Sequence, residues 1–178
     1  MKDGIYNEFC SQRRAGRHIT RPLAFRGREL PESQYALWMS QNLAGPQGEM
    51  TAVYQYLYQN WVLRCSFPEI AAVLVRISKV EMHHLDIFGQ VIGLLGGEPR
   101  CQARPNVYRS AWSGNMINYT KDLRKMLSYN MFLEQTAVDT YTKLACSVQD
   151  DCLSAILNRV AQDEQVHVHI YQDLLDML

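Results

Sequence analysis

Residues 76–84 read RISKVEMHH, and residues 159–167 read RVAQDEQVH. Both segments follow the pattern R-x-x-x-x-E-x-x-H, in which the glutamate and the histidine are three residues apart and share one face of a helix. The residues around Glu81 and Glu164 on those faces are mostly leucine, isoleucine, valine and aromatic, so each face should point into a protein core. An unpaired carboxylate is costly to bury. The pattern therefore predicts two buried glutamate–histidine pairs that need a positive partner.

Two further glutamates recur in the same way. Residues 49–56 read EMTAVYQY and residues 134–141 read EQTAVDTY, so both copies follow E-x-T-A-V-x-x-Y. Glu49 and Glu134 also lie on apolar helix faces. The two copies are 85 residues apart here and 83 residues apart at Glu81 and Glu164, a difference that one loop can absorb. The repeats predict two related helical hairpins with approximate two-fold symmetry; the alternative is chance similarity between amphipathic helices.

The rest of the chain indicates an all-α fold in two parts. Residues 1–31 are interrupted by glycine and proline and show no sustained period, which predicts an irregular arm. Residues 32–178 predict a bundle domain with a short leading helix. We expect helices at about 32–43, 47–64, 68–95, 115–147 and 150–177, each bounded by glycine, proline or capping residues. Short connections within the pairs and a long connection between them are the arrangement of a ferritin-like four-helix bundle.

Four glutamates on core-facing helix stripes would carry four negative charges into one interior. No lysine or arginine lies near them on those stripes, so two divalent cations are the simplest neutralising partner, and the histidines add neutral nitrogen ligands. One glutamate from each of two helices and Glu-x-x-His from each of the other two form the dinuclear site of ferritin-like bundles. Carboxylate and imidazole donors suit iron or manganese. The predicted metal ligands are Glu49, Glu81, His84, Glu134, Glu164 and His167. The alternative is that these are solvated glutamates and core histidines.

These motifs resemble those of the ferritin-like superfamily, which includes bacterioferritin, rubrerythrin and manganese catalase. The segment from Gly45 to Glu49 is similar to the start of the first ligand helix in manganese catalases and their spore-coat relatives. Residues 81–84 resemble the E-M-x-H segment of bacterioferritins, and residues 163–167 resemble the D-E-x-x-H segment of bacterioferritins and rubrerythrins. The resemblance covers about residues 46–178.

The resemblance implies a role for each residue of the site. Glu81 and Glu164 would bridge two metal ions, Glu49 and Glu134 would be terminal ligands, and His84 and His167 would each bind one ion. Two tyrosines would lie beside the metals, Tyr56 as a catalytic residue and Tyr141 as its counterpart in the second repeat.

An outer acid is implied for only one of the two histidines. Asp163 resembles an acid that orients a ligand histidine of the opposite hairpin, here His84. Val80 stands at the equivalent place in the first repeat, so His167 would lack such a partner and the two metal sites would be unequal.

Other departures narrow the resemblance. The chain has no C-x-x-C pair, so the iron-binding rubredoxin domain of full-length rubrerythrins is not expected. Rubrerythrins carry an additional glutamate ligand near the one that Glu134 resembles. In this chain the residues three positions before and after Glu134 are Met131 and Ala137, which are not acidic. Met82 resembles in position the haem-ligating methionine of bacterioferritins, although a packing role is the alternative.

Charge and hydropathy exclude several functional classes. The chain has 18 basic and 18 acidic residues, so its formal net charge is zero and a nucleic-acid partner is not expected. Residues 1–31 contain seven basic and three acidic residues, so the arm by itself is basic. The sequence contains no run of 18 apolar residues, so a membrane-spanning helix is not expected. Residues 1–24 lack the apolar segment of a secretory signal. We expect a cytoplasmic protein.

The sequence predicts a dinuclear iron or manganese oxidoreductase that acts on hydrogen peroxide or dioxygen, as a peroxidase, an oxidase or a manganese-type catalase. An external electron donor and assembly into a homo-oligomer, a dimer or hexamer, are part of this expectation. Two alternatives stay open: iron oxidation and storage, and a structural or coat protein with a vestigial metal site.

Overall fold

A computed structural model describes residues 34–103 and 110–178 of the chain. The predicted N-terminal arm, residues 1–31, lies outside the described residues. The helices, in chain order, are α2 (Gln34–Ala44), α3 (Glu49–Leu63), α4 (Pro68–Leu94), α5 (Leu123–Ser147) and α6 (Asp151–Asp176).

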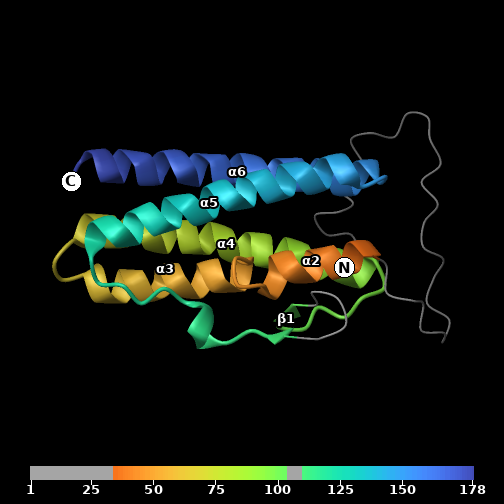
Figure 1. The fold of residues 1–178 in the computed structure, drawn as a ribbon, viewed down its shortest axis with the longest axis horizontal. Coiled ribbons are helices and arrows are strands. Elements are labelled where there is room, and N and C mark those ends of the chain that lie inside the picture. Colours follow the sequence, from red (N-terminus) through yellow and green to blue (C-terminus); the bar gives the residue numbers. More distant parts are fainter. Residues whose placement is uncertain (1–33, 104–109) are drawn as a thin grey trace.

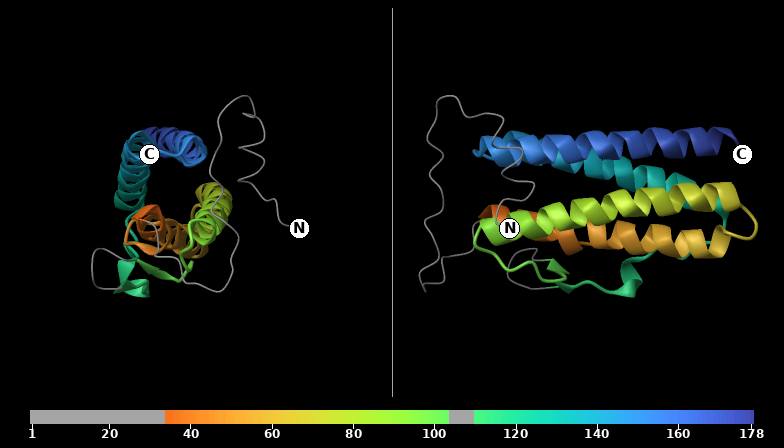
Figure 2. Two further views of the ribbon diagram at one scale, coloured as in Figure 1. Left: turned by 90° about the vertical axis from the view of Figure 1, so that its right-hand side faces the viewer. Right: turned by 180° about the vertical axis from the view of Figure 1, so that it is seen from behind.

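The four long helices form two antiparallel hairpins. Helices α3 and α4 make the first hairpin and α5 and α6 make the second, and all four run along the long axis of the molecule (Figure 1). Seen end-on, the helices occupy the corners of a square in which α5 lies beside α3 and α6 lies beside α4 (Figure 2). The arrangement confirms the predicted all-α, ferritin-like bundle of two hairpins joined by a long crossover.

The crossover contains short elements that the sequence did not predict. They are β1 (Gln102–Ala103), its antiparallel partner β2 (Ser110–Ala111) and the 3-10 turn η1 (Gly114–Met116). Two hydrogen bonds attach the crossover to α3: the Trp112 indole N–H donates to the Thr51 hydroxyl at 3.0 Å, and the Asn118 backbone N–H donates to the Gln55 side-chain oxygen at 3.0 Å. The connection therefore lies along α3 rather than extending into solvent (Figure 1).

One predicted boundary is wrong. The sequence predicts a helix that starts at about residue 115, but α5 begins at Leu123. Asp122 has extended backbone angles and its carboxylate accepts a hydrogen bond from the Lys125 backbone N–H at 2.9 Å, so it caps the helix. Just before the helix, the Thr120 backbone N–H donates to the Asn118 side-chain oxygen at 3.0 Å and the Asp122 backbone N–H donates to the Thr120 hydroxyl at 3.4 Å, so these backbone groups bond to side chains instead of within a helix.

The bundle has two apolar clusters separated by a polar layer. One cluster lies at the end covered by α2 and includes Met39, Phe88 and Leu157. The other lies at the opposite end and includes Leu74, Leu127 and Tyr171. The buried glutamates and histidines occur between these clusters along α4, α5 and α6. The apolar ends thus supply the burial energy that holds a charged centre in place.

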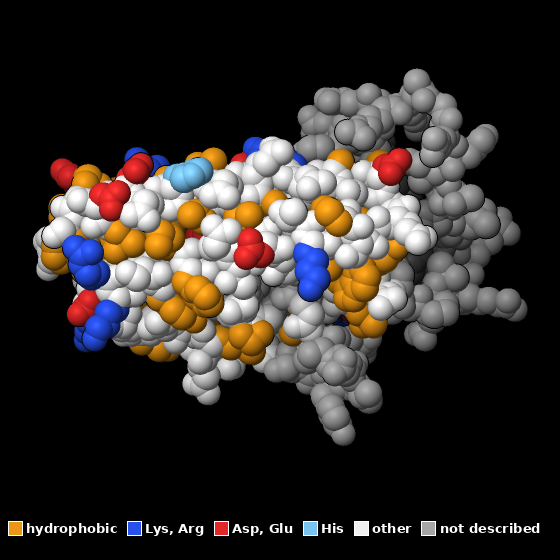
Figure 3. Space-filling model, turned by 45° about the horizontal axis from the view of Figure 1, so that its top comes forward, with side chains coloured by type: hydrophobic (Ala, Val, Ile, Leu, Met, Phe, Trp, Pro, Cys, Tyr) orange, Lys and Arg blue, Asp and Glu red, His pale blue; other side chains and the backbone are white. Residues whose placement is uncertain are grey.

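None of the helices in the described ranges is long and apolar enough to cross a membrane. On the face of the molecule drawn in Figure 3, acidic and basic side chains are interspersed among hydrophobic ones, without a large basic area. This face agrees with the balanced charge of the sequence.

Candidate metal centre

Each helix of the bundle contributes to one buried cluster of carboxylates and imidazoles. Helix α3 supplies its first residue, α5 supplies one glutamate from its middle, and α4 and α6 each supply a glutamate and a histidine one turn apart. All six residues have at most 4% of their surface exposed: Glu49, Glu81, His84, Glu134, Glu164 and His167. The structure thus brings all six predicted ligands together.

A tight turn places Glu49 at the start of α3. The Gly48 backbone N–H donates to the Gly45 oxygen at 3.0 Å, and the Thr51 hydroxyl donates to the same oxygen at 3.0 Å. A Cβ atom on Gly48 would lie 2.5 Å from the Asn42 backbone oxygen, so the turn has no room for a side chain there. The glycine lets α2 approach closely and fixes the first residue of α3, where the helix dipole favours a carboxylate.

The six residues form two overlapping groups, each able to surround one ion. The ligand atoms of Glu49, Glu81, His84 and Glu164 lie within 4.8 Å of one another, and so do those of Glu81, Glu134, Glu164 and His167. Two glutamates, Glu81 and Glu164, belong to both groups. The terminal glutamate and the histidine differ between the groups.

The two shared carboxylates each direct one oxygen to each histidine. The Nδ1 atom of His84 lies 3.0 Å from Glu81 Oε2 and 3.0 Å from Glu164 Oε1. The Nδ1 atom of His167 lies 2.9 Å from Glu81 Oε1 and 3.0 Å from Glu164 Oε2. About 3 Å is the spacing of neighbouring ligands around an ion that binds them at about 2.1 Å in octahedral geometry.

Several buried atoms of the cluster lack hydrogen-bond partners. Glu81 Oε1 and Glu164 Oε1 approach a histidine nitrogen closely, but neither atom has a hydrogen-bond partner of suitable geometry. Buried oxygens rarely stay unsatisfied in proteins. Atoms that converge without bonding one another are what a shared cation requires, so the donor set fits two divalent ions.

Crowding changes the acidity of the glutamates. Burial, followed by repulsion from Glu164 and Glu81, raises the pKa of Glu49 well above its usual value. Burial and repulsion from Glu164 raise the pKa of Glu134 to about 7. Burial also favours the neutral form of Glu81, but hydrogen bonds with the two histidines outweigh it and lower the pKa of this carboxyl.

The pKa values of the two histidines are raised, although burial alone would lower them. Desolvation by itself would lower the pKa of both, but the surrounding carboxylates raise the pKa of His84, with Asp163 contributing most, and raise that of His167 to about 12. The centre without metal therefore relieves its negative charge by binding protons. Metal ions would displace those protons.

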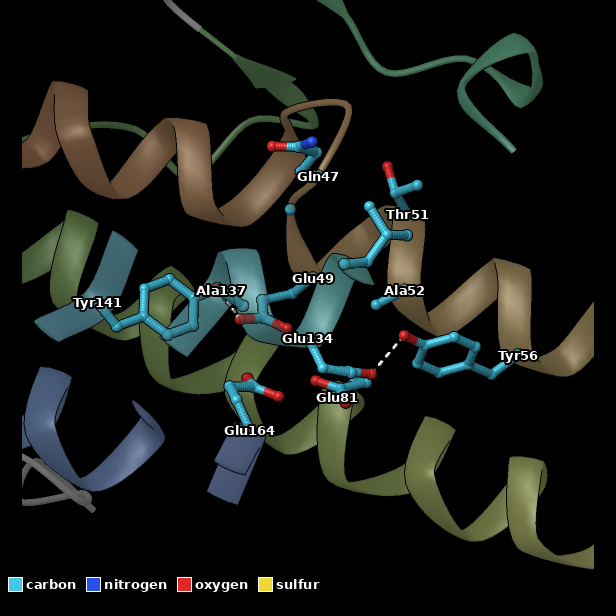
Figure 4. A pocket seen from close by; sticks show the side chains of 12 residues that line it. Gln47, Glu49, Thr51, Ala52, Tyr56, Glu81, Glu134, Ala137, Tyr141 and Glu164 are labelled. Carbon is cyan, nitrogen blue, oxygen red and sulfur yellow. Dashed lines mark hydrogen bonds between the residues drawn. The ribbon is translucent and has the colours of Figure 1, made fainter. Parts of the chain in front are cut away.

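The two predicted tyrosines connect the repeats. The Tyr56 hydroxyl on α3 donates to Glu134 Oε1 on α5, and the Tyr141 hydroxyl on α5 donates to Glu49 Oε1 on α3 (Figure 4). Burial, then the adjacent carboxylate, raises the pKa of both phenols well above 10.0, so each stays protonated and donates.

Asp163 lies on the outer side of His84. Its Oδ2 atom is 3.5 Å from His84 Nε2, and its other oxygen pairs with Arg159 Nη1 at 2.5 Å. His84 thus points Nδ1 into the cluster and Nε2 toward an acid, which is the orientation expected for a ligand histidine.

A buried polar network beside Tyr56 was missed by the sequence analysis. Asn130 on α5 accepts hydrogen bonds from the side-chain amides of Gln55 (3.1 Å) and Gln59 (3.0 Å). The Tyr171 ring packs on Tyr56 with ring centroids 5.8 Å apart, and its buried hydroxyl lies near the polar groups of Tyr56 and Asn130. Tyr171 lies seven residues after Glu164, and Phe88 lies seven residues after Glu81. A comparison of the two repeats could therefore have shown that one has a tyrosine where the other has a phenylalanine.

A small pocket leads to the cluster between α3 and α5. It is lined by the four glutamates, by both tyrosines and by the small side chains of Ala52 and Ala137 (Figure 4). Gln47 at its rim is exposed, so the pocket reaches the surface. Its volume of about 20 Å³ is enough for a molecule the size of water.

The fold and the cluster define the chain as a ferritin-like helical bundle with a carboxylate–histidine centre. Residues 44–175 match the family model of rubrerythrin, and the chain belongs to the rubrerythrin family. The resemblance to the ferritin-like superfamily is thereby confirmed.

Two relatives illustrate the range of this superfamily. A protein named probable manganese catalase from Clostridium acetobutylicum is 25% identical over 166 residues, covering 83% of this chain and 73% of the relative. A bacterioferritin from Desulfovibrio desulfuricans is 27% identical over 130 residues, covering 71% and 67%.

Solved structures show the same fold. The manganese catalase from Anabaena has a TM-score of 0.72 at 20% identity, covering 92% of this chain and 80% of that one. The Desulfovibrio desulfuricans bacterioferritin, described with a diiron site, has a TM-score of 0.66 at 21% identity and covers 80% and 78%.

Proposed function

We propose that the chain is a dinuclear iron or manganese redox protein that acts on hydrogen peroxide or dioxygen. The observation that supports it is the buried set of six ligands in which Glu81 and Glu164 are shared by two groups. A structural protein with a vestigial site would not need to keep six converging ligands in an otherwise apolar core, since each buried charge costs stability.

The side chains have separate tasks in this proposal. Glu81 and Glu164 would be shared by the two ions, and Glu49 and Glu134 would each bind one of them. His84 and His167 would each supply one nitrogen, and in both residues Nδ1 is the atom that faces the carboxylates. Bound iron or manganese would supply electron exchange and an open coordination position for an oxygen species.

Tyr56 is the proposed catalytic residue. It lines the pocket and holds its hydroxyl proton against Glu134, so a small substrate entering the pocket meets a positioned proton donor. The narrow pocket limits the substrate to small molecules and excludes bulky organic ones.

The proposal covers several versions of this chemistry, and the manganese catalase relative favours the catalase. A catalase needs only peroxide, whereas a peroxidase or oxidase requires an external electron donor. Iron oxidation and storage is the second candidate, favoured by the bacterioferritin relative. Carboxylate and imidazole donors bind both metals, so the donor set does not choose between them.

Assembly and location belong to the same proposal. Large side chains such as Trp61, Phe132 and Val166 are more than half exposed, and in a homo-oligomer they would be available for contacts between copies. We expect this assembly to be a dimer or hexamer in the cytoplasm; its mass would separate it from a large storage cage.

Metal loading and peroxide turnover test the proposal. The protein is stripped with a chelator, reloaded with ferrous iron or with manganese, and assayed for bound metal, peroxide consumption and oxygen release. We expect about two ions per chain and turnover with at least one metal. Glu81→Ala should lose both, whereas Glu69→Ala, at an exposed glutamate in the first turn of α4, should lose neither. A folded Glu81→Ala protein with full metal content and full turnover would overturn the proposal.

A further inference from the structure

The two halves of the centre differ in what lies behind the ligand histidines. Asp163 stands one residue before the shared Glu164, and its carboxylate lies 3.5 Å from the Nε2 atom of His84. Val80 stands one residue before the shared Glu81 in the other repeat. Within residues 34–103 and 110–178, no carboxylate oxygen lies within 4.0 Å of the Nε2 atom of His167.

The outer acid of His84 is itself held in place. Arg159 Nη1 pairs with Asp163 at 2.5 Å, four residues apart on α6. Arg76 is the counterpart of Arg159 in the first repeat, and its fourth following residue is Val80, which cannot pair with it. The apolar residue thus removes a two-part anchor, the acid and its arginine, from one half only.

The second ring nitrogen of His84, Nε2, faces Asp163, so this is the nitrogen that should carry the proton when Nδ1 binds a metal ion. Nε2 is buried, and Asp163 Oδ2, 3.5 Å away, is the one carboxylate oxygen within 4.0 Å of it among the described residues. An acid at this place fixes the ring orientation and the tautomer of a ligand histidine, and removing such a partner costs about 10–100-fold in metal affinity.

We infer that the two metal positions are unequal, and that the position formed by Glu49, His84 and the shared glutamates binds a divalent ion more tightly than the position formed by Glu134 and His167. This inference rests on the proposed function. It assigns the tight position to the half with Asp163 and the exchangeable position to the half with Val80.

The location of the first ion is the decisive observable. Two adjacent cations repel each other, so stepwise binding alone would occur even at equal positions. Crystals of the full chain grown with one equivalent of manganese per chain, with diffraction data above and below the manganese edge, give the occupancy of each position directly. We expect the anomalous peak beside His84 to be about tenfold stronger than the peak beside His167.

Two substitutions should change this ratio in a defined way. Val80→Asp provides an outer acid for His167 and should bring the two peaks close to equal height. Asp163→Asn weakens the anchor of His84 and should also make the peaks more equal, with a weaker first binding step by calorimetry. Met82→Asp adds the same charge as Val80→Asp at an exposed neighbouring position and should leave the ratio unchanged.

The outcomes separate this inference from the proposed function. Equal peaks in the unmodified protein, or a ratio unchanged by both Val80→Asp and Asp163→Asn, would overturn the inference and leave the dinuclear centre intact. A protein that binds no manganese or iron at all would overturn both.

Discussion

The two tyrosines of the centre make the same bond in different surroundings. Tyr56 and Tyr141 each donate to a terminal glutamate from the opposite hairpin. Tyr56 packs against Tyr171, whereas Tyr141 packs against Phe88, with ring centroids 5.4 Å apart. A second phenol therefore lies beside Tyr56, whereas the ring beside Tyr141 is an apolar phenylalanine.

Replacing each tyrosine by phenylalanine separates structure from catalysis. Tyr56→Phe and Tyr141→Phe each leave one buried glutamate oxygen without its donor, so both should lower the free energy of unfolding of the metal-free protein by about 1–3 kcal/mol. Turnover of peroxide by the metal-loaded protein should fall about 100-fold in Tyr56→Phe and much less in Tyr141→Phe. Urea unfolding and initial rates measure the two effects. Equal losses of turnover would show that Tyr56 has no special catalytic part.

Single functional residues can be predicted from the sequence when a charged side chain lies on a helix face that is otherwise apolar. Glu81 and Glu164 stand out because carboxylates on apolar helix faces need an explanation. Tyr171 and Asn130 do not stand out, because a tyrosine suits a core and one asparagine in a helix has no pattern. Only the fold shows that their polar groups come together.

The turn between α2 and α3 determines where Glu49 lies. The turn is closed by backbone hydrogen bonds and by the Thr51 hydroxyl, and Gly48 packs directly against the last turn of α2. A shift of this turn would displace Glu49, which is the first residue of α3 and one of the predicted metal ligands.

Substitution of Gly48 tests the role of this turn. In Gly48→Ala the new Cβ would meet the Asn42 oxygen at 2.5 Å, so the backbone must shift, and we expect a loss of about 1–3 kcal/mol in stability together with loss of the ion on the Glu49 side. Gly93→Ala is the matched control, because nothing lies within 4 Å of its Cβ and alanine favours a helix by about 0.5–1 kcal/mol. Thermal unfolding and metal content report both. Full metal content in Gly48→Ala would refute the proposed role.

Element boundaries show where local patterns stop being informative. The end of α4 was expected from Gly96 and Gly97, and Gly96 indeed has a positive φ of 81°. The start of α5 was misplaced because the residues before Asp122 bond to one another and to α3. The β1–β2 pair was missed because two-residue strands carry no alternation to detect.

Proton binding couples the centre to the stability of the whole molecule. In the metal-free protein the pKa values of Glu49, Glu134, His84 and His167 are raised above those of an unfolded chain, so the folded state binds more protons. Stability must then fall as pH rises, first above 4.5 through about 7 for Glu134, and then above 6.5 toward about 12 for His167. The lowered pKa values of Glu81 and Asp163 act in the opposite sense, but only in acid.

Metal removal should therefore matter more at higher pH. Between about pH 5 and pH 8 the melting temperature of the metal-free protein should decline, whereas the metal-loaded protein should decline less because the ions replace the protons. The gap between the two melting temperatures should widen with pH, as calorimetric scans with and without chelator can record. A gap that stays constant or narrows would contradict this account.

Anomalous diffraction from the fully loaded protein tests the central claim most directly. Crystals soaked with ferrous iron or manganese, measured above and below the corresponding absorption edge, should show two peaks in the bundle interior, one beside His84 and one beside His167. Glu81 and Glu164 should lie between the two peaks. Absence of any peak in this cluster after exposure to both metals would contradict the account.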